Sequence, residues 1–86
     1  MNPKQRKKKA EQINAQLLEA LIMARKVKTP KMPRKDLAAA LGVEPSTALR
    51  LENGTYKLTI SRLIEWADIL GVDPVELFTQ ACKKGK

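Results

Sequence analysis

Prolines and glycines divide this chain into short segments, and their positions constrain the fold more than any other feature of the sequence. Pro30 and Pro33 follow one long segment, and Gly42, Gly54 and Gly71 follow three further ones. Proline lacks an amide donor and glycine accepts a left-handed backbone, so both residues commonly end helices. Between these breaks, apolar residues recur every three or four positions, the period of an α-helix. The sequence therefore predicts an all-α fold of five helices.

The predicted helices cover residues 13–28, 34–41, 45–53, 60–70 and 74–81. Pro45 suits the first position of the third helix, where a missing N–H is no loss. Thr59 is the expected N-cap of the fourth helix, and Asp73 with Glu76 forms a capping-box pattern for the fifth. The apolar stripe expected to face inward from the fourth helix comprises Ile60, Leu63, Ile64, Ala67 and Leu70.

The composition excludes several classes of function. The chain has 86 residues, enough for one small domain, with three aromatic residues, one cysteine and no histidine. Cys–His and Ser–His nucleophile pairs, zinc fingers and intrachain disulfides are therefore excluded, and we expect no enzyme activity, cofactor or metal. No apolar run approaches the roughly 18 residues that span a bilayer. We expect a soluble cytoplasmic protein without a membrane partner.

The charge is unevenly distributed along the chain. Seventeen basic residues face nine acidic ones, for a net charge of +8. Residues 1–35 carry eleven basic and two acidic side chains, whereas residues 36–76 carry three basic and seven acidic ones. A basic run begins the chain and comprises Lys4, Arg6, Lys7, Lys8 and Lys9. Such an excess favours an anionic partner, with nucleic acid as the first candidate.

Residues 34–54 have the spacing of a helix-turn-helix, in which the second helix enters the major groove. Ala38 is small enough for the two helices to cross closely, and Gly42 suits the turn. Val43, Ala48 and Leu51 fill the angle between the helices. On the opposite side of the second helix, Ser46, Leu49, Arg50 and Asn53 follow at helical spacing.

Arg50 is the one basic residue in this recognition segment. Arginine bound to guanine through two hydrogen bonds is the commonest specific contact in the major groove. The alternative is that Arg50 neutralises a phosphate or pairs with a surface acid. Leu49 packs on a thymine methyl group or is a plain surface residue, and the pattern does not separate these two possibilities.

With these residues in place, the chain resembles the lambda-repressor-like (Xre/Cro) helix-turn-helix family from about Leu17 to Phe78. The resemblance is carried by Leu51-Glu52-Asn53-Gly54 and by residues 71–78, which read GVDPVELF. It implies a five-helix DNA-binding domain that acts as a dimer on a palindromic double-stranded operator. It also implies an ion pair between Arg25 and Glu52.

The resemblance assigns DNA contacts to Arg34, Pro45, Ser46, Thr47 and Arg50, and helix spacing and sequence position add the other expected contacts. Base contacts are expected from Pro45, Ser46, Thr47, Leu49 and Arg50. Contacts to the DNA backbone are expected from Arg34, Lys35, Asn53, Tyr56 and Lys57. The chain departs from the family where Pro33 and Glu44 replace the usual Ser or Thr caps, and where the connection through Pro30 is about two residues longer.

We therefore expect three parts. Residues 1–12 form a basic N-terminal arm or a helix extension, residues 13–81 form the DNA-binding domain, and residues 82–86 form a basic tail. The expected function is sequence-specific DNA binding by a homodimeric transcriptional repressor encoded by a bacterium or a phage. An antitoxin or another protein-interaction module with the same fold is the alternative, and non-specific binding of nucleic acid or of an anionic membrane by the basic ends alone is a further one.

Overall fold

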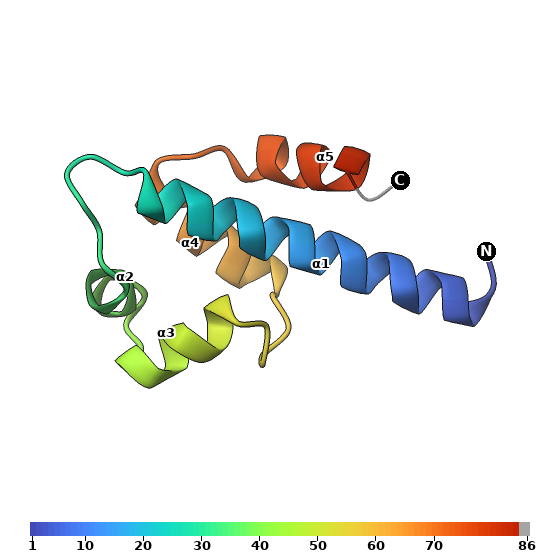
Figure 1. Ribbon diagram of the computed structural model, residues 1–86, viewed down its shortest axis with the longest axis horizontal. Coiled ribbons are helices and arrows are strands. Elements are labelled where there is room, and N and C mark those ends of the chain that lie inside the picture. Colours follow the sequence, from blue (N-terminus) through green and yellow to red (C-terminus); the bar gives the residue numbers. More distant parts are fainter. Residues whose placement is uncertain (85–86) are drawn as a thin grey trace.

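Five helices and no strand occur in residues 1–84, which are the residues that the computed structural model describes (Figure 1). The helices are α1 (Pro3–Lys26), α2 (Arg34–Leu41), α3 (Pro45–Glu52), α4 (Ile60–Leu70) and α5 (Pro74–Lys84). The predicted all-α, five-helix fold is confirmed. Gly85 and Lys86, part of the predicted basic tail, lie outside the described residues, and residues 82–84 of that segment continue α5 to its end at Lys84.

Helix α1 begins at Pro3, ten residues before the expected start at Ile13, so residues 3–12 continue the helix instead of forming an arm. The Asn2 side chain accepts a hydrogen bond from the Gln5 backbone N–H at 2.8 Å, and the Gln5 side chain accepts one from the Asn2 N–H at 3.0 Å. This is a complete capping box with proline at the first helical position, and it satisfies amides that would otherwise lack partners. The sequence interpretation overlooked it because the cationic run carries no apolar period.

The turn between α2 and α3 forms as its sequence predicts. Gly42 adopts φ 73° and ψ 31°, and the N–H of Val43 donates to the carbonyl of Ala38 at 2.9 Å. This left-handed C-terminal cap reverses the chain within a few residues. Pro45 then occupies the first turn of α3, and neither Pro33 nor Glu44 caps its helix through a side chain.

The core is aliphatic around one tryptophan. Trp66 is fully buried, and α1 packs against both α4 and α5. The buried cluster comprises Leu17, Leu18, Leu21, Leu37, Leu41, Leu51, Leu63, Trp66, Leu70 and Ala81. α2 and α3 pack on each other and lie below α1 in the view of Figure 1, and they contribute Leu37, Leu41 and Leu51 to the cluster.

The stripe predicted for α4 is wrong at two positions. Ile60 and Ile64 are 77% and 52% exposed, and the side that faces inward consists of Leu63, Trp66, Ala67 and Leu70. Both sets repeat at helical spacing, so periodicity alone does not choose between them. Placing the large indole of Trp66 at the centre of the core rotates α4 and leaves the two isoleucines outside.

We expect Gly42→Ala to lower the free energy of unfolding by about 1 kcal/mol, because a left-handed backbone costs a residue with a Cβ atom roughly 1–2 kcal/mol. No atom lies within 4 Å of a Cβ atom built at Gly42, so the loss comes from the backbone. Gly42→Asn should lose less, since asparagine tolerates this conformation. Urea unfolding followed by Trp66 fluorescence measures both, and an alanine variant as stable as the parent would contradict the expectation.

Candidate nucleic-acid interface

One side of α3 is open to solvent, and it carries the residues expected to read bases. Pro45, Ser46, Leu49 and Arg50 are exposed, whereas Thr47 is half-buried. Ala48 and Leu51, on the other side of the helix, are buried and anchor it to the core. Leu49 is 45% exposed, which leaves its apolar side chain available at the surface. The buried side of α3 thus fixes which side chains face outward.

Asn53 organises the exit from α3. Its carboxamide oxygen accepts hydrogen bonds from the backbone N–H of Thr55 at 3.0 Å and from the Thr55 hydroxyl at 2.6 Å. Such a turn holds the following loop close to the end of the helix. Since the oxygen is engaged, the NH₂ is the group of the Asn53 side chain that remains for an outside partner.

A hollow of about 350 Å³ lies beside α3 and contains side chains suited to phosphate. Two cations and three hydroxyl groups line it, together with one leucine. The lining residues are Thr47, Leu51, Tyr56, Lys57, Thr59 and Arg62. The structure thus brings together Thr47, Tyr56 and Lys57, which the sequence had assigned to separate DNA contacts.

Thr59 and Arg62 were overlooked as members of this interface. Thr59 caps α4 by accepting a hydrogen bond from the Arg62 N–H at 3.1 Å, so the hollow also lies at the positive end of α4. Arg62 approaches Glu65 at 3.8 Å, which is a loose pair. The N-cap at Thr59 was the available signal, because helix N-termini favour anions.

Glu52 binds two arginines from two other helices. Arg25 Nε lies 2.6 Å from Glu52 Oε2, and Arg25 Nη2 donates to Oε1 at 3.2 Å. Arg34 Nε donates to the same Oε1 at 2.8 Å, and Arg25 Nη1 donates to the carbonyl of Met32 at 3.2 Å. The structure thus brings Arg25 and Glu52 together, as the resemblance implied, and adds Arg34. We call these three residues the ion triad.

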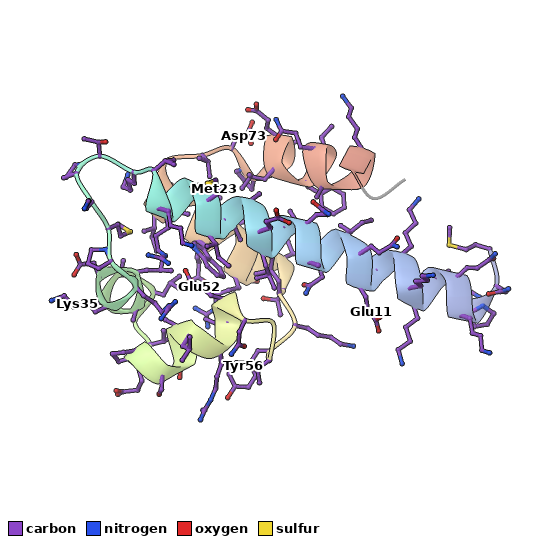
Figure 2. The ribbon with its side chains drawn as sticks, in the orientation of Figure 1. Glu11, Met23, Lys35, Glu52, Tyr56 and Asp73 are labelled. Atoms are coloured by element: carbon purple, nitrogen blue, oxygen red, sulfur yellow. The ribbon has the colours of Figure 1, made fainter. Side chains whose placement is uncertain are left out.

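The ion triad ties the end of α3 to the end of α1 and the start of α2. The side chains of Arg25 and Glu52 are 9% and 4% exposed, whereas that of Arg34 is 44% exposed. Figure 2 shows Glu52 in the space bounded by α1, α2 and α3. Arg34, expected to bind phosphate, therefore has its Nε engaged within the protein and keeps its two terminal nitrogens for an outside partner.

The remaining expected cations lie on the surface. Lys35 projects outward from α2, and Tyr56 lies below α3 in the view of Figure 2. Four cations of the basic run are exposed on the first turns of α1 and the fifth is half-buried: Lys4, Arg6, Lys7, Lys8 and Lys9. The N–H of Leu58 donates to Asn14 Oδ1 at 3.2 Å, and this bond holds the loop after α3 against α1.

Residues 1–84 contain no cluster of three or more side chains that could hold a metal ion. None of the helices described is long and apolar enough to cross a membrane. Cys82 is a free, half-buried cysteine near the end of α5.

The exposed side of α3, the turn at Gly42 and the cationic hollow define a helix-turn-helix DNA-binding protein. Comparison with protein families agrees, because the helix-turn-helix family model matches residues 23–77. The chain belongs to the lambda-repressor-like (Xre/Cro) helix-turn-helix family, whose members are DNA-binding regulators. No curated protein and no solved structure matches the chain. The basic run at the N-terminus lies outside the matched residues.

Removing Glu52 should destabilise the protein strongly, because Arg25 would then be a buried charge without a partner. We expect Glu52→Ala to cost about 3–5 kcal/mol of unfolding free energy. Arg34→Ala should cost about 1 kcal/mol or less, since that side chain is 44% exposed. Thermal or urea unfolding followed by Trp66 fluorescence measures both losses. Glu44→Ala is the matched control on the exposed end of α3, and a loss there equal to that of Glu52→Ala would refute this account of the ion triad.

Proposed function

We propose that this protein is a sequence-specific transcriptional repressor whose α3 lies in the major groove of a palindromic operator. The observation that supports this most is the exposed side of α3 together with the hollow beside the same helix, which Thr47, Lys57 and Arg62 line. A helix that reads bases needs neighbouring groups that hold the phosphates on either side, because phosphate contacts set its register. Bound at a promoter in the cytoplasm of a bacterium, the protein would exclude RNA polymerase.

In this proposal Arg50 reads a guanine, since it is the one cation on α3 and its side chain is exposed. Ser46 and Thr47 lie in the first turn of α3, which is the end that approaches the bases. Leu49 contacts a thymine methyl group. Pro45 offers van der Waals contact only, so direct reading rests on few polar groups.

The proposed backbone contacts surround this helix. Arg34 and Lys35 begin α2, and Asn53 ends α3. Tyr56, Lys57 and the newly found Arg62 line one hollow, which suits a single phosphate. Each phosphate neutralised by such a side chain steepens the dependence of affinity on salt by about 0.9 in the log–log slope.

We further propose that the protein binds as a homodimer. Ile60 and Ile64 are exposed one turn apart on α4. Contact between large apolar side chains and water is unfavourable, and a partner that covers them removes this free-energy cost. Two copies would place their α3 helices in half-sites about 34 Å apart.

A second candidate function is that of an antitoxin, whose main partner is a protein and whose DNA binding serves autoregulation. Val75 and Phe78 on α5 favour it, since they are 71% and 48% exposed. A partner protein on α5 would leave α3 free for DNA.

Selection of bound duplexes from a random library tests the proposed function. We expect a palindromic consensus with guanine at a fixed place in each half. Failure to enrich any sequence would instead favour binding of nucleic acid by the basic ends alone.

Arg50→Ala should weaken binding to the selected operator by about 10- to 100-fold, because a good arginine–guanine pair contributes roughly 1–3 kcal/mol of discrimination. Binding to random duplex should change much less. Lys57→Ala is the matched control, since a phosphate contact should be lost equally on both duplexes. Fluorescence anisotropy with labelled duplexes measures all four affinities, and equal losses for Arg50→Ala on both duplexes would make it a phosphate contact.

Ile64→Glu should shift the protein from dimer to monomer, because the proposed contact would bury a carboxylate. Sedimentation equilibrium at micromolar concentration measures the shift. Ser61→Glu, an exposed residue of the same helix, is the control for added charge. A parent protein that stays monomeric even on a palindromic duplex would contradict the homodimer.

A further inference from the structure

The N-terminal turns of α1 project from the body that the other described helices form (Figure 1). They extend past the other helices at the right of Figure 1, along the 42 Å long axis of the molecule. Residues 4–9 contain five cations, and Glu11 is the one acidic residue before Glu19. Residues 1–8 and 10–12 are exposed, and Lys9 is half-buried. Residues 2–12, which are the N-cap Asn2 and the first ten residues of α1, are called the basic extension below.

The charges of the basic extension oppose its helical structure. Lys4 and Lys8 are four residues apart and Arg6 and Lys9 are three apart, so like charges adjoin on the helix surface. The cations also lie at the positive end of the helix dipole, and the first turn contains no acidic residue. A helix with this arrangement is weakened by its own charges until an anion neutralises them.

Uncharged groups of the same segment favour the helix. The Asn2–Gln5 capping box closes its N-terminus, and Pro3 is already fixed at a helical φ. From Leu17 onward α1 is buried against the core, so the extension adds turns to an existing helix and needs no new nucleus. Capping stabilises the helix of this segment and charge repulsion destabilises it. A bound polyanion removes the repulsion and therefore favours the helix.

The distribution of the charges selects the kind of polyanion. At about 100° per residue, the five cations point to all sides of the helix, and no apolar stripe separates them. A helix that lies on a membrane needs an apolar side. Phosphates of a nucleic acid can meet such a helix from more than one direction, as they do in a groove.

The basic extension also lies near the proposed DNA site. Asn14 accepts a hydrogen bond from the N–H of Leu58, in the loop that carries Tyr56 and Lys57. The extension therefore leaves the body beside the loop that follows α3. Ten helical residues reach about 15 Å, a length over which a duplex carries about nine phosphate charges.

We propose that the basic extension is a second nucleic-acid site, which binds phosphates next to those proposed at α3, and that these phosphates stabilise its helix. The site is independent of base sequence. Placing it on the same duplex as α3 rests on the proposed function, whereas its phosphate binding does not. Its consequence is that an uncharged residue, Asn2, contributes to DNA affinity through helix capping.

Two variants of the full chain separate charge from helix formation. The charge variant carries Lys4→Ala, Lys7→Ala and Lys8→Ala, and the cap variant carries Asn2→Ala with Gln5→Ala. Affinity for a random-sequence duplex is measured from about 50 to 300 mM NaCl, a range that includes physiological ionic strength. The charge variant should lose up to about 0.9 of log–log slope for each lysine that contacts phosphate. The cap variant should bind up to about fivefold more weakly at about 50 mM NaCl and should lose less at higher salt, where screening already favours the helix.

Gln12→Ala is the matched control for the cap variant, because it removes an exposed amide from the extension without touching the capping box. Trp66 fluorescence verifies that each variant retains the folded core. Circular dichroism at 222 nm should show the helix content of the free parent rising with NaCl, as salt screens the repulsion. The cap variant should begin with less helix than the parent.

A cap variant that binds like Gln12→Ala would refute the link between helix and binding, and a charge variant with the parent slope would refute the site. If the basic extension bound vesicles containing phosphatidylglycerol more tightly than the duplex, its ligand would be an anionic membrane and the proposed nucleic-acid site would be refuted. If library selection fails but both variants behave as expected, the proposed repressor function is wrong and the basic extension still stands as a nucleic-acid site.

Discussion

The buried ion pair between Arg25 and Glu52 is the constraint on which the placement of the recognition helix depends. Two opposite charges removed from water are stable only while each satisfies the other, so Glu52 at the end of α3 cannot leave the end of α1 without a large free-energy penalty. Arg34 shares the same carboxylate and thereby fixes the start of α2. Three helices are thus held by one carboxylate. The exposed side of α3 consequently has a defined orientation relative to Lys57 and Arg62, which DNA reading requires.

The division of charge along the chain now has a structural meaning. The acidic middle of the sequence includes Glu52, whose charge is neutralised inside the protein by Arg25. Arg50 is the one cation on α3. In the proposed function, electrostatic attraction to DNA comes from groups around α3: the start of α2, the hollow at the start of α4 and the projecting end of α1. That proposal assigns specificity and attraction to different elements. Affinity would then respond to salt while the proposed base contacts of α3 stay the same.

Much of the fold could be predicted because its helix ends are local. Gly42 and Gly71 stop helices through backbone conformations that involve only neighbouring residues, and Thr59 caps α4 within one turn. The candidate site was less predictable. The hollow joins Thr47 to Arg62 across two helices, and nothing in the spacing of these residues announces that they meet. Arg34 was expected only to contact phosphate. Its hydrogen bond to Glu52 was not foreseen, because Glu52 lies 18 residues further along the chain.

The sequence by itself determined the number of helices, the helix-turn-helix segment and the family, because breaks, caps and apolar period are written in short stretches of residues. Tertiary structure decided how each helix is rotated. α4 turns Trp66 inward and leaves Ile60 and Ile64 outside, although both arrangements satisfy the same helical period. Tertiary structure also decided which charged side chains are paired inside the protein and which remain exposed to a partner. Both outcomes depend on the volume and charge that other helices present, and no local pattern contains that information.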